Sequence, residues 1–152
     1  MTPRSLKMKF VMILFIVFLS MNQVHVSGSY TGLTLDITHA WYADGQGDGK
    51  QNDAFAVVTF NIDNGLSKNI LRYNITITLP SGVYHTYSVK LNTSQTNFEI
   101  QNNFWNHATE SGWYSVSITA SLNYNCHTVS DTLTFDPPGG DNADPISFSI
   151  ST

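Results

Sequence analysis

Seven stretches of this chain carry apolar side chains at every second position, and this alternation constrains the fold more than any other feature. Successive side chains of a β-strand point to opposite faces, so the pattern is typical of a strand with one buried face. The predicted strands are 33–38, 58–62, 71–79, 87–91, 97–101, 114–122 and 129–135. Short strands at this spacing predict an all-β, two-sheet sandwich, with a jelly roll or a small barrel as the structural alternatives.

Turn residues separate the predicted strands. Pro80-Ser81-Gly82 predicts a tight hairpin between the third and fourth strands, and Asp63-Asn64-Gly65 ends the second. The segment 137–145 is rich in proline, glycine and aspartate and predicts a linker after a domain spanning 30–136. Residues 146–152 then alternate again and predict a short terminal strand or tail.

The first 28 residues have the order of a secretory signal peptide. Arg4, Lys7 and Lys9 precede an unbroken apolar run at 10–19, and small residues follow at 27–29. The run is shorter than the roughly 20 apolar residues that a transmembrane helix needs. We therefore expect 1–28 to be removed and the protein to be secreted or displayed at the extracellular surface. The alternative is an uncleaved signal anchor, which is the only predicted contact with a membrane.

The charge beyond residue 28 restricts the partners. Four basic residues, Lys50, Lys68, Arg72 and Lys90, stand against eleven acidic ones, a net charge of −7. Nucleic acids and anionic lipids bind to basic surfaces, so the balance argues against both. The single cysteine, Cys126, excludes an intrachain disulfide. We expect a buried, inert thiol there, with a link between two chains as the alternative.

The segment Glu110-Ser111-Gly112-Trp113-Tyr114-Ser115-Val116 carries a resemblance to a known family. It resembles the sixth-strand signature of immunoglobulin-like domains, acid-x-Gly-x-Tyr-x-Cys, with Val116 in place of the cysteine. The resemblance implies an immunoglobulin-like sandwich of about seven strands in which Tyr114 forms a corner, its hydroxyl bonded back to the nearby backbone. It also implies kinship with adhesion-type modules that lack the disulfide.

A polar loop between the first two predicted strands has the spacing of a calcium site. Calcium binds several oxygen atoms of a tight loop, with donors at alternate positions and glycine at the sharp turn. Gly49 occupies the turn position, whereas Phe55 stands where a bidentate glutamate is usual. The loop resembles a degenerate Asp-rich calcium loop, and a flexible polar connection is the alternative. The candidate Ca²⁺ ligands are Asp44, Gln46, Asp48, Lys50 through its carbonyl, Asn52 and Asp53.

Two sequons predict N-glycosylation in a host that glycosylates secreted proteins. They are Asn74-Ile75-Thr76 and Asn92-Thr93-Ser94. We expect Asn74 on the polar face of its strand and Asn92 in a loop, both accessible.

Four aromatic residues, Trp41, Tyr42, Trp105 and Trp113, are candidates for a sugar-stacking platform. Trp41 and Trp113 flank strands, so we expect them to pack at the ends of the sandwich. Trp105 lies in a polar segment and is the best candidate for exposure, whereas packing in the core is the interpretation that the sequence favours for these residues.

The sequence does not favour catalysis. Cys126 and His127 are adjacent, and neighbours on a strand face opposite ways. The sequence therefore predicts a non-catalytic interaction or adhesion module whose partners are other surface proteins or glycans. The alternatives are a self-assembling surface-filament subunit, joined through Ile146, Phe148 and Ile150, and a carbohydrate-binding module.

Overall fold

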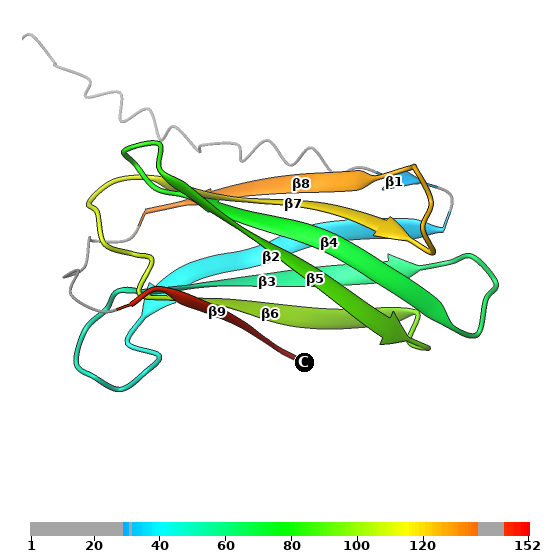
Figure 1. Ribbon diagram of the computed structural model, residues 1–152, viewed down its shortest axis with the longest axis horizontal. Helices are drawn as coiled ribbons and strands as arrows, with labels where there is room; N and C mark the ends of the chain where they lie inside the picture. Colours follow the sequence, from blue (N-terminus) through cyan, green and yellow to red (C-terminus); the bar gives the residue numbers. More distant parts are fainter. Residues whose placement is uncertain (1–28, 31, 137–144) are drawn as a thin grey trace, which may run out of the picture.

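The computed structural model describes residues 29–30, 32–136 and 145–152, and this part of the chain consists of strands and turns without a helix. The predicted signal segment 1–28 and residues 137–144 of the predicted linker lie outside the described residues. Two antiparallel sheets pack face to face (Figure 1). In spatial order, one sheet contains β1 (Ser29–Tyr30), β2 (Leu33–Ala43), β3 (Asp53–Ile62), β6 (Asn97–Trp105) and β9 (Ser147–Ser151). The other contains β5 (Tyr84–Thr93), β4 (Asn69–Thr78), β7 (Tyr114–Leu122) and β8 (Val129–Phe135).

Every segment with period-two alternation forms a strand, so the prediction of an all-β sandwich is confirmed. The largest differences are in β2, which continues to Ala43 and not to residue 38, and in β3, which begins at Asp53 and not at residue 58. The first four residues of β3 are all buried, because both sides of this strand are covered there. A strand covered on both faces does not alternate, and the pattern gives no sign of it.

The turns also match the prediction. The β4–β5 hairpin closes with the Gly82 N–H donating to the Leu79 carbonyl at 2.9 Å. Gly82 has a φ of 87°, a conformation that glycine adopts without steric cost. Strand β3 ends at Ile62, directly before Asp63-Asn64-Gly65.

The core lies between the two sheets and includes one polar link. The Tyr73 hydroxyl, from β4, donates to Asn102 Oδ1, from β6, at 2.9 Å. The Asn102 amide donates in turn to the carbonyls of Ala56 and Ile100, both at 3.3 Å. A buried amide with such partners is stabilising and fixes how the two sheets face each other.

Tyr114 makes the bond that the resemblance at 110–116 implies. Its ring is buried, and its hydroxyl donates to the Glu110 carbonyl at 2.9 Å and accepts from the Glu110 N–H at 2.7 Å. Val116, in the position of the family's cysteine, is buried in the apolar interior.

The terminal strand β9 pairs with β6 of its own chain. Phe148 stacks on Tyr87 of β5, with ring centroids 4.4 Å apart and 7° between the planes. Because β5 belongs to the other sheet, this contact closes one side of the sandwich.

Candidate functional site

The predicted calcium loop connects β2 to β3, and its acidic side chains accept backbone hydrogen bonds. Asp44 Oδ1 accepts from the N–H groups of Gly47 and Asp48 at 2.7 and 3.0 Å, and Asp44 Oδ2 accepts from Gly49 at 2.9 Å. Asp48 Oδ1 accepts from the Lys50 N–H at 2.9 Å. Gln46 and Lys50 stand on the same loop, and Gln46 is exposed. The loop is thus held by the residue types that turns use.

Asp53 and Asn52 lie at the base of this loop and attach it to the body. The carboxylate of Asp53 is fully buried; Oδ2 accepts from Gly45 and Gln46 at 2.9 and 3.2 Å, and Oδ1 accepts from the Asn106 N–H at 2.8 Å. The Asn52 carbonyl accepts from the Ala108 N–H at 2.7 Å. Within the described ranges, no three His, Cys, Asp or Glu side chains converge as a metal ion requires. Calcium binding here stays a prediction.

The tryptophans are arranged differently from the prediction. Trp105 is half-buried: its ring meets Phe55 edge-on at 5.6 Å, and its Nε1–H donates to the Ser149 hydroxyl at 2.9 Å. Trp41 stacks on the Phe55 ring, with the ring centroids 5.3 Å apart, and is 37 % exposed. Trp113 is 54 % exposed. Trp105, the best candidate for exposure, is less exposed than Trp41 and Trp113, because β6 continues through Trp105 and its indole bonds to β9.

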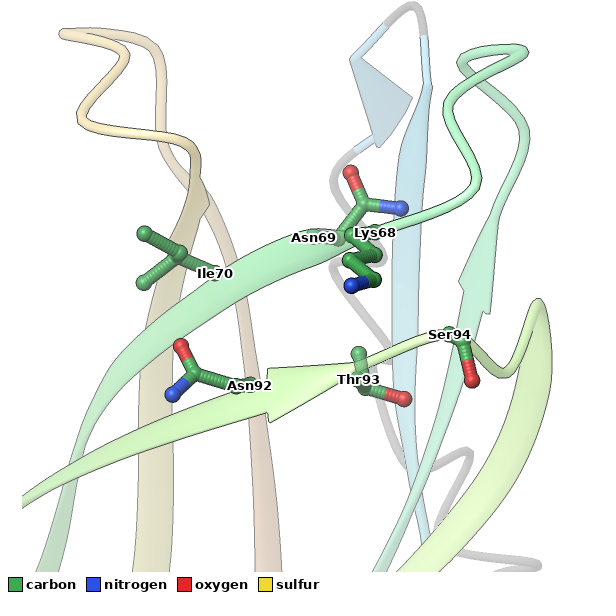
Figure 2. A pocket seen from close by; sticks show the side chains of 6 residues that line it. All are labelled: Lys68, Asn69, Ile70, Asn92, Thr93 and Ser94. Atoms are coloured by element: carbon green, nitrogen blue, oxygen red, sulfur yellow. The ribbon is translucent and has the colours of Figure 1, made fainter.

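Both sequon asparagines are exposed. Asn74 Oδ1 accepts from the Ser88 hydroxyl at 2.7 Å, which leaves the oxygen engaged and the amide nitrogen available. Asn92 lies in β5, paired with Ile70, and not in a loop as expected. It lines a hollow of about 540 Å³ with Lys68, whose side chain extends from the start of β4 toward the end of β5 (Figure 2).

Cys126 is exposed in the turn between β7 and β8. The expected burial of this thiol was wrong: residues 123–128, which join β7 to β8, are all exposed.

A buried histidine was not singled out by the sequence. His107 Nδ1 lies 2.7 Å from the Trp105 carbonyl, so this nitrogen donates, and Nε2 accepts from the Tyr87 hydroxyl at 2.7 Å. Burial lowers the pKa of His107 to about 4, because a charged imidazole loses its hydration there. Both ring nitrogens are engaged and the ring is neutral, so His107 is a structural residue rather than a general base.

The outer face of the β5-β4-β7-β8 sheet is the second feature that the sequence did not reveal. We define it as the residues of these four strands that point away from the core. They are the even-numbered residues of 70–78 in β4, 84–92 in β5 and 130–134 in β8. In β7 they are the odd-numbered residues of 115–121. Most of them are Ser, Thr or Asn, and the two charged ones are Arg72 and Lys90. The only acid in these four strands is Asp131, which points into the core.

The charge is therefore segregated. Three of the four basic residues beyond position 28, Lys68, Arg72 and Lys90, lie on or beside β4 and β5, while the protein as a whole is acidic. The overall net charge hides this local excess, which appears only once the register of the strands is known.

No protein-family model matches the chain, and no curated protein or solved structure matches it either. The described residues include no helix that is long and apolar enough to span a membrane.

Proposed function

We propose that this protein is a non-catalytic extracellular interaction module of the immunoglobulin-like sandwich type. Three features support the proposal: the strand orders of the two sheets, the bond of Tyr114 to Glu110, and the signal-like residues 1–28. A fold of this kind hosts many functions, so the function must be argued from a surface.

The outer face of the β5-β4-β7-β8 sheet carries the proposal. It is a hydroxyl-rich surface with local positive charge in a protein of opposite net charge. Such segregation attracts a partner of complementary charge and orients it during encounter. This surface combines a hollow with two cations and a row of hydrogen-bonding side chains.

An array of extracellular protein domains and glycans tests this function. Thr119→Trp places a bulky side chain on the outer face, and Asn61→Trp places one on the exposed side of the other sheet. We expect bound spots that Thr119→Trp abolishes and Asn61→Trp leaves unchanged. An array without bound spots, or equal loss in both variants, would contradict the proposal.

A second candidate function is self-assembly by exchange of β9 between copies. Two observations favour it. β9 is an edge strand that follows 137–144 in the sequence. Its Phe148 packs on aromatic rings of both sheets, Tyr87 of β5 and Phe104 of β6. A β9 from another copy would make the same contacts, which is how strands are donated in surface filaments.

Two additions from the sequence also stay proposals. Ca²⁺ at the β2–β3 loop would stiffen the end of the sandwich, and exposed aromatic residues would add a sugar-stacking surface. Trp113 takes the place of Trp105 in that second idea because it is the more exposed of the two.

A further inference from the structure

Two rows of side chains cross the outer face next to each other. Strand register places Lys90, Arg72 and Ser121 in one row across β5, β4 and β7. The next row contains Ser88, Asn74 and Thr119. These six residues line a hollow of about 400 Å³, a volume within the usual range of small-ligand sites.

The cations of the first row are directly opposite each other. Like charges at facing positions of an antiparallel pair are destabilising. The outer face of the four strands offers no carboxylate to offset the repulsion. A bound anion between Arg72 and Lys90 would offset this repulsion.

Arg72 is also incompletely satisfied. Its Nε is buried and has no hydrogen-bond partner among the described residues. Its guanidinium carbon lies 4.3 Å from the centre of the Tyr124 ring, a cation–π contact that holds the side chain over the sheet. The hydrogen bond from Arg72, together with the charges of Arg72 and Lys90, lowers the pKa of the Tyr124 phenol. The local potential is therefore positive.

We propose that this hollow binds the carboxylate or sulfate group of an acidic saccharide, with Arg72 and Lys90 holding the anion. A guanidinium presents several donors in a fixed plane and suits a planar or tetrahedral oxyanion. The hydroxyls of Thr119 and Ser121 can each donate and accept, and so suit the hydroxyl groups of a sugar ring. Ser88 donates to Asn74 Oδ1, which leaves the Ser88 oxygen to accept and the Asn74 amide nitrogen to donate. The inference rests on the proposed function and names its ligand class.

The hollow and the first sequon overlap. Asn74 lines the hollow, so an N-glycan attached there would lie at its rim. The test therefore uses the full chain produced in a host that does not N-glycosylate.

Isothermal titration with four probes tests the proposal: a uronic-acid disaccharide, a sulfated disaccharide, a neutral disaccharide and hexaglutamate. We expect binding of at least one acidic disaccharide, with the neutral disaccharide and hexaglutamate at least about tenfold weaker. The ratio between the two acidic disaccharides identifies the preferred anion. Raising the salt concentration should weaken the binding, because the cations are partly exposed.

Three charge-removing variants give the matched comparison. Arg72→Gln and Lys90→Gln should each weaken binding about tenfold or more, as expected for loss of a charge-assisted contact. Lys50→Gln removes the same charge from the β2–β3 loop, at the other end of the sandwich (Figure 1), and should change binding less than about twofold. Near-ultraviolet circular dichroism checks that each variant is folded.

Several outcomes would overturn the proposal. They are equal binding of neutral and acidic disaccharides, equal binding of hexaglutamate, no effect of Arg72→Gln and Lys90→Gln, or an equal effect of Lys50→Gln. If no acidic disaccharide binds while the array still shows binding that Thr119→Trp abolishes, the ligand class is wrong and the interaction function stands.

Discussion

The carboxylate of Asp131 in β8 accepts the backbone N–H of Ile37 in β2 at 2.7 Å, and so joins the two sheets at the open side of the sandwich. The register of β2 against β3 shifts between Ile37 and His39, and β1 pairs with β2 only at Leu33 and Thr34 within the described residues. The N–H of Ile37 therefore needs an acceptor from outside its own sheet. Asp131 also accepts from the Thr132 N–H at 2.7 Å.

Removing this acceptor should destabilise the fold. Asp131→Ala leaves two buried or partly buried N–H groups without the carboxylate, and we expect a loss of about 3 kcal/mol in the free energy of unfolding. Asp131→Asn keeps one carbonyl oxygen and should lose less. Urea denaturation measures both, with Asp63→Asn as an exposed control. A loss below about 0.5 kcal/mol for Asp131→Ala would mean that this bond does not hold the sheets together.

The Tyr114 hydroxyl gives a second prediction. Tyr114→Phe keeps the buried ring but leaves the carbonyl and N–H of Glu110 without their partner, so we expect a loss of about 1–2 kcal/mol. Tyr84→Phe, at a side chain 69 % exposed, is the matched control and should be neutral. Equal denaturation midpoints for the two variants would argue against a structural corner at Tyr114.

His107 predicts how stability depends on pH. Its pKa is about 4 in the folded protein and 6.5 in the unfolded chain, so between these values the unfolded chain binds the proton and the folded protein does not. Stability is therefore fully present above pH 6.5 and falls as the pH drops toward 4, by about 3 kcal/mol from this group. The loss should not continue below the folded pKa.

Denaturation at several pH values separates His107 from the carboxylates. His107→Phe removes the titrating group and should flatten the curve between pH 6.5 and 5 relative to wild type. His39→Gln, at an exposed histidine, should leave the wild-type slope intact. The same slope in His107→Phe and wild type would show that His107 is not the group responsible.

The seven alternating strands, their turns and the bond of Tyr114 could be predicted because each depends on local sequence. The first residues of β3 could not, since that segment is covered on both sides. The half-burial of Trp105 depends on where β6 ends and on the hydrogen bond of its indole to β9, and neither is visible in the local sequence. The pairing of Lys90 with Arg72 likewise depends on register between strands, which alternation alone does not give.

The terminal strand supplies a fourth prediction. Phe148 is half-buried between Tyr87 and Phe104, with centroids 4.4 and 5.4 Å away, so Phe148→Ala should cost about 2 kcal/mol, less than a fully buried phenylalanine. Ile146→Ala, at a side chain 44 % exposed, is the control.

Light scattering on the same samples measures oligomeric state. If β9 is exchanged between copies, wild type forms oligomers and deletion of 146–152 abolishes them. A protein that is monomeric and equally stable with and without 146–152 excludes the exchange.

The β2–β3 loop gives the last prediction. If the loop binds Ca²⁺ with a dissociation constant of about 10⁻⁴ to 10⁻³ M, the range of weak extracellular sites, then 5 mM Ca²⁺ should stabilise the fold by about 1–2 kcal/mol relative to chelator. For a domain of this size the unfolding midpoint then rises by about 3–8 °C. Asp48→Asn removes one exposed carboxylate of the loop and should reduce the rise, whereas Asp63→Asn, outside the loop, should not. Asp44 already accepts hydrogen bonds from the N–H groups of Gly47, Asp48 and Gly49, so the loop has a way to satisfy this acid without a cation. An unchanged midpoint would mean that backbone N–H groups, rather than a cation, satisfy the acids of this loop.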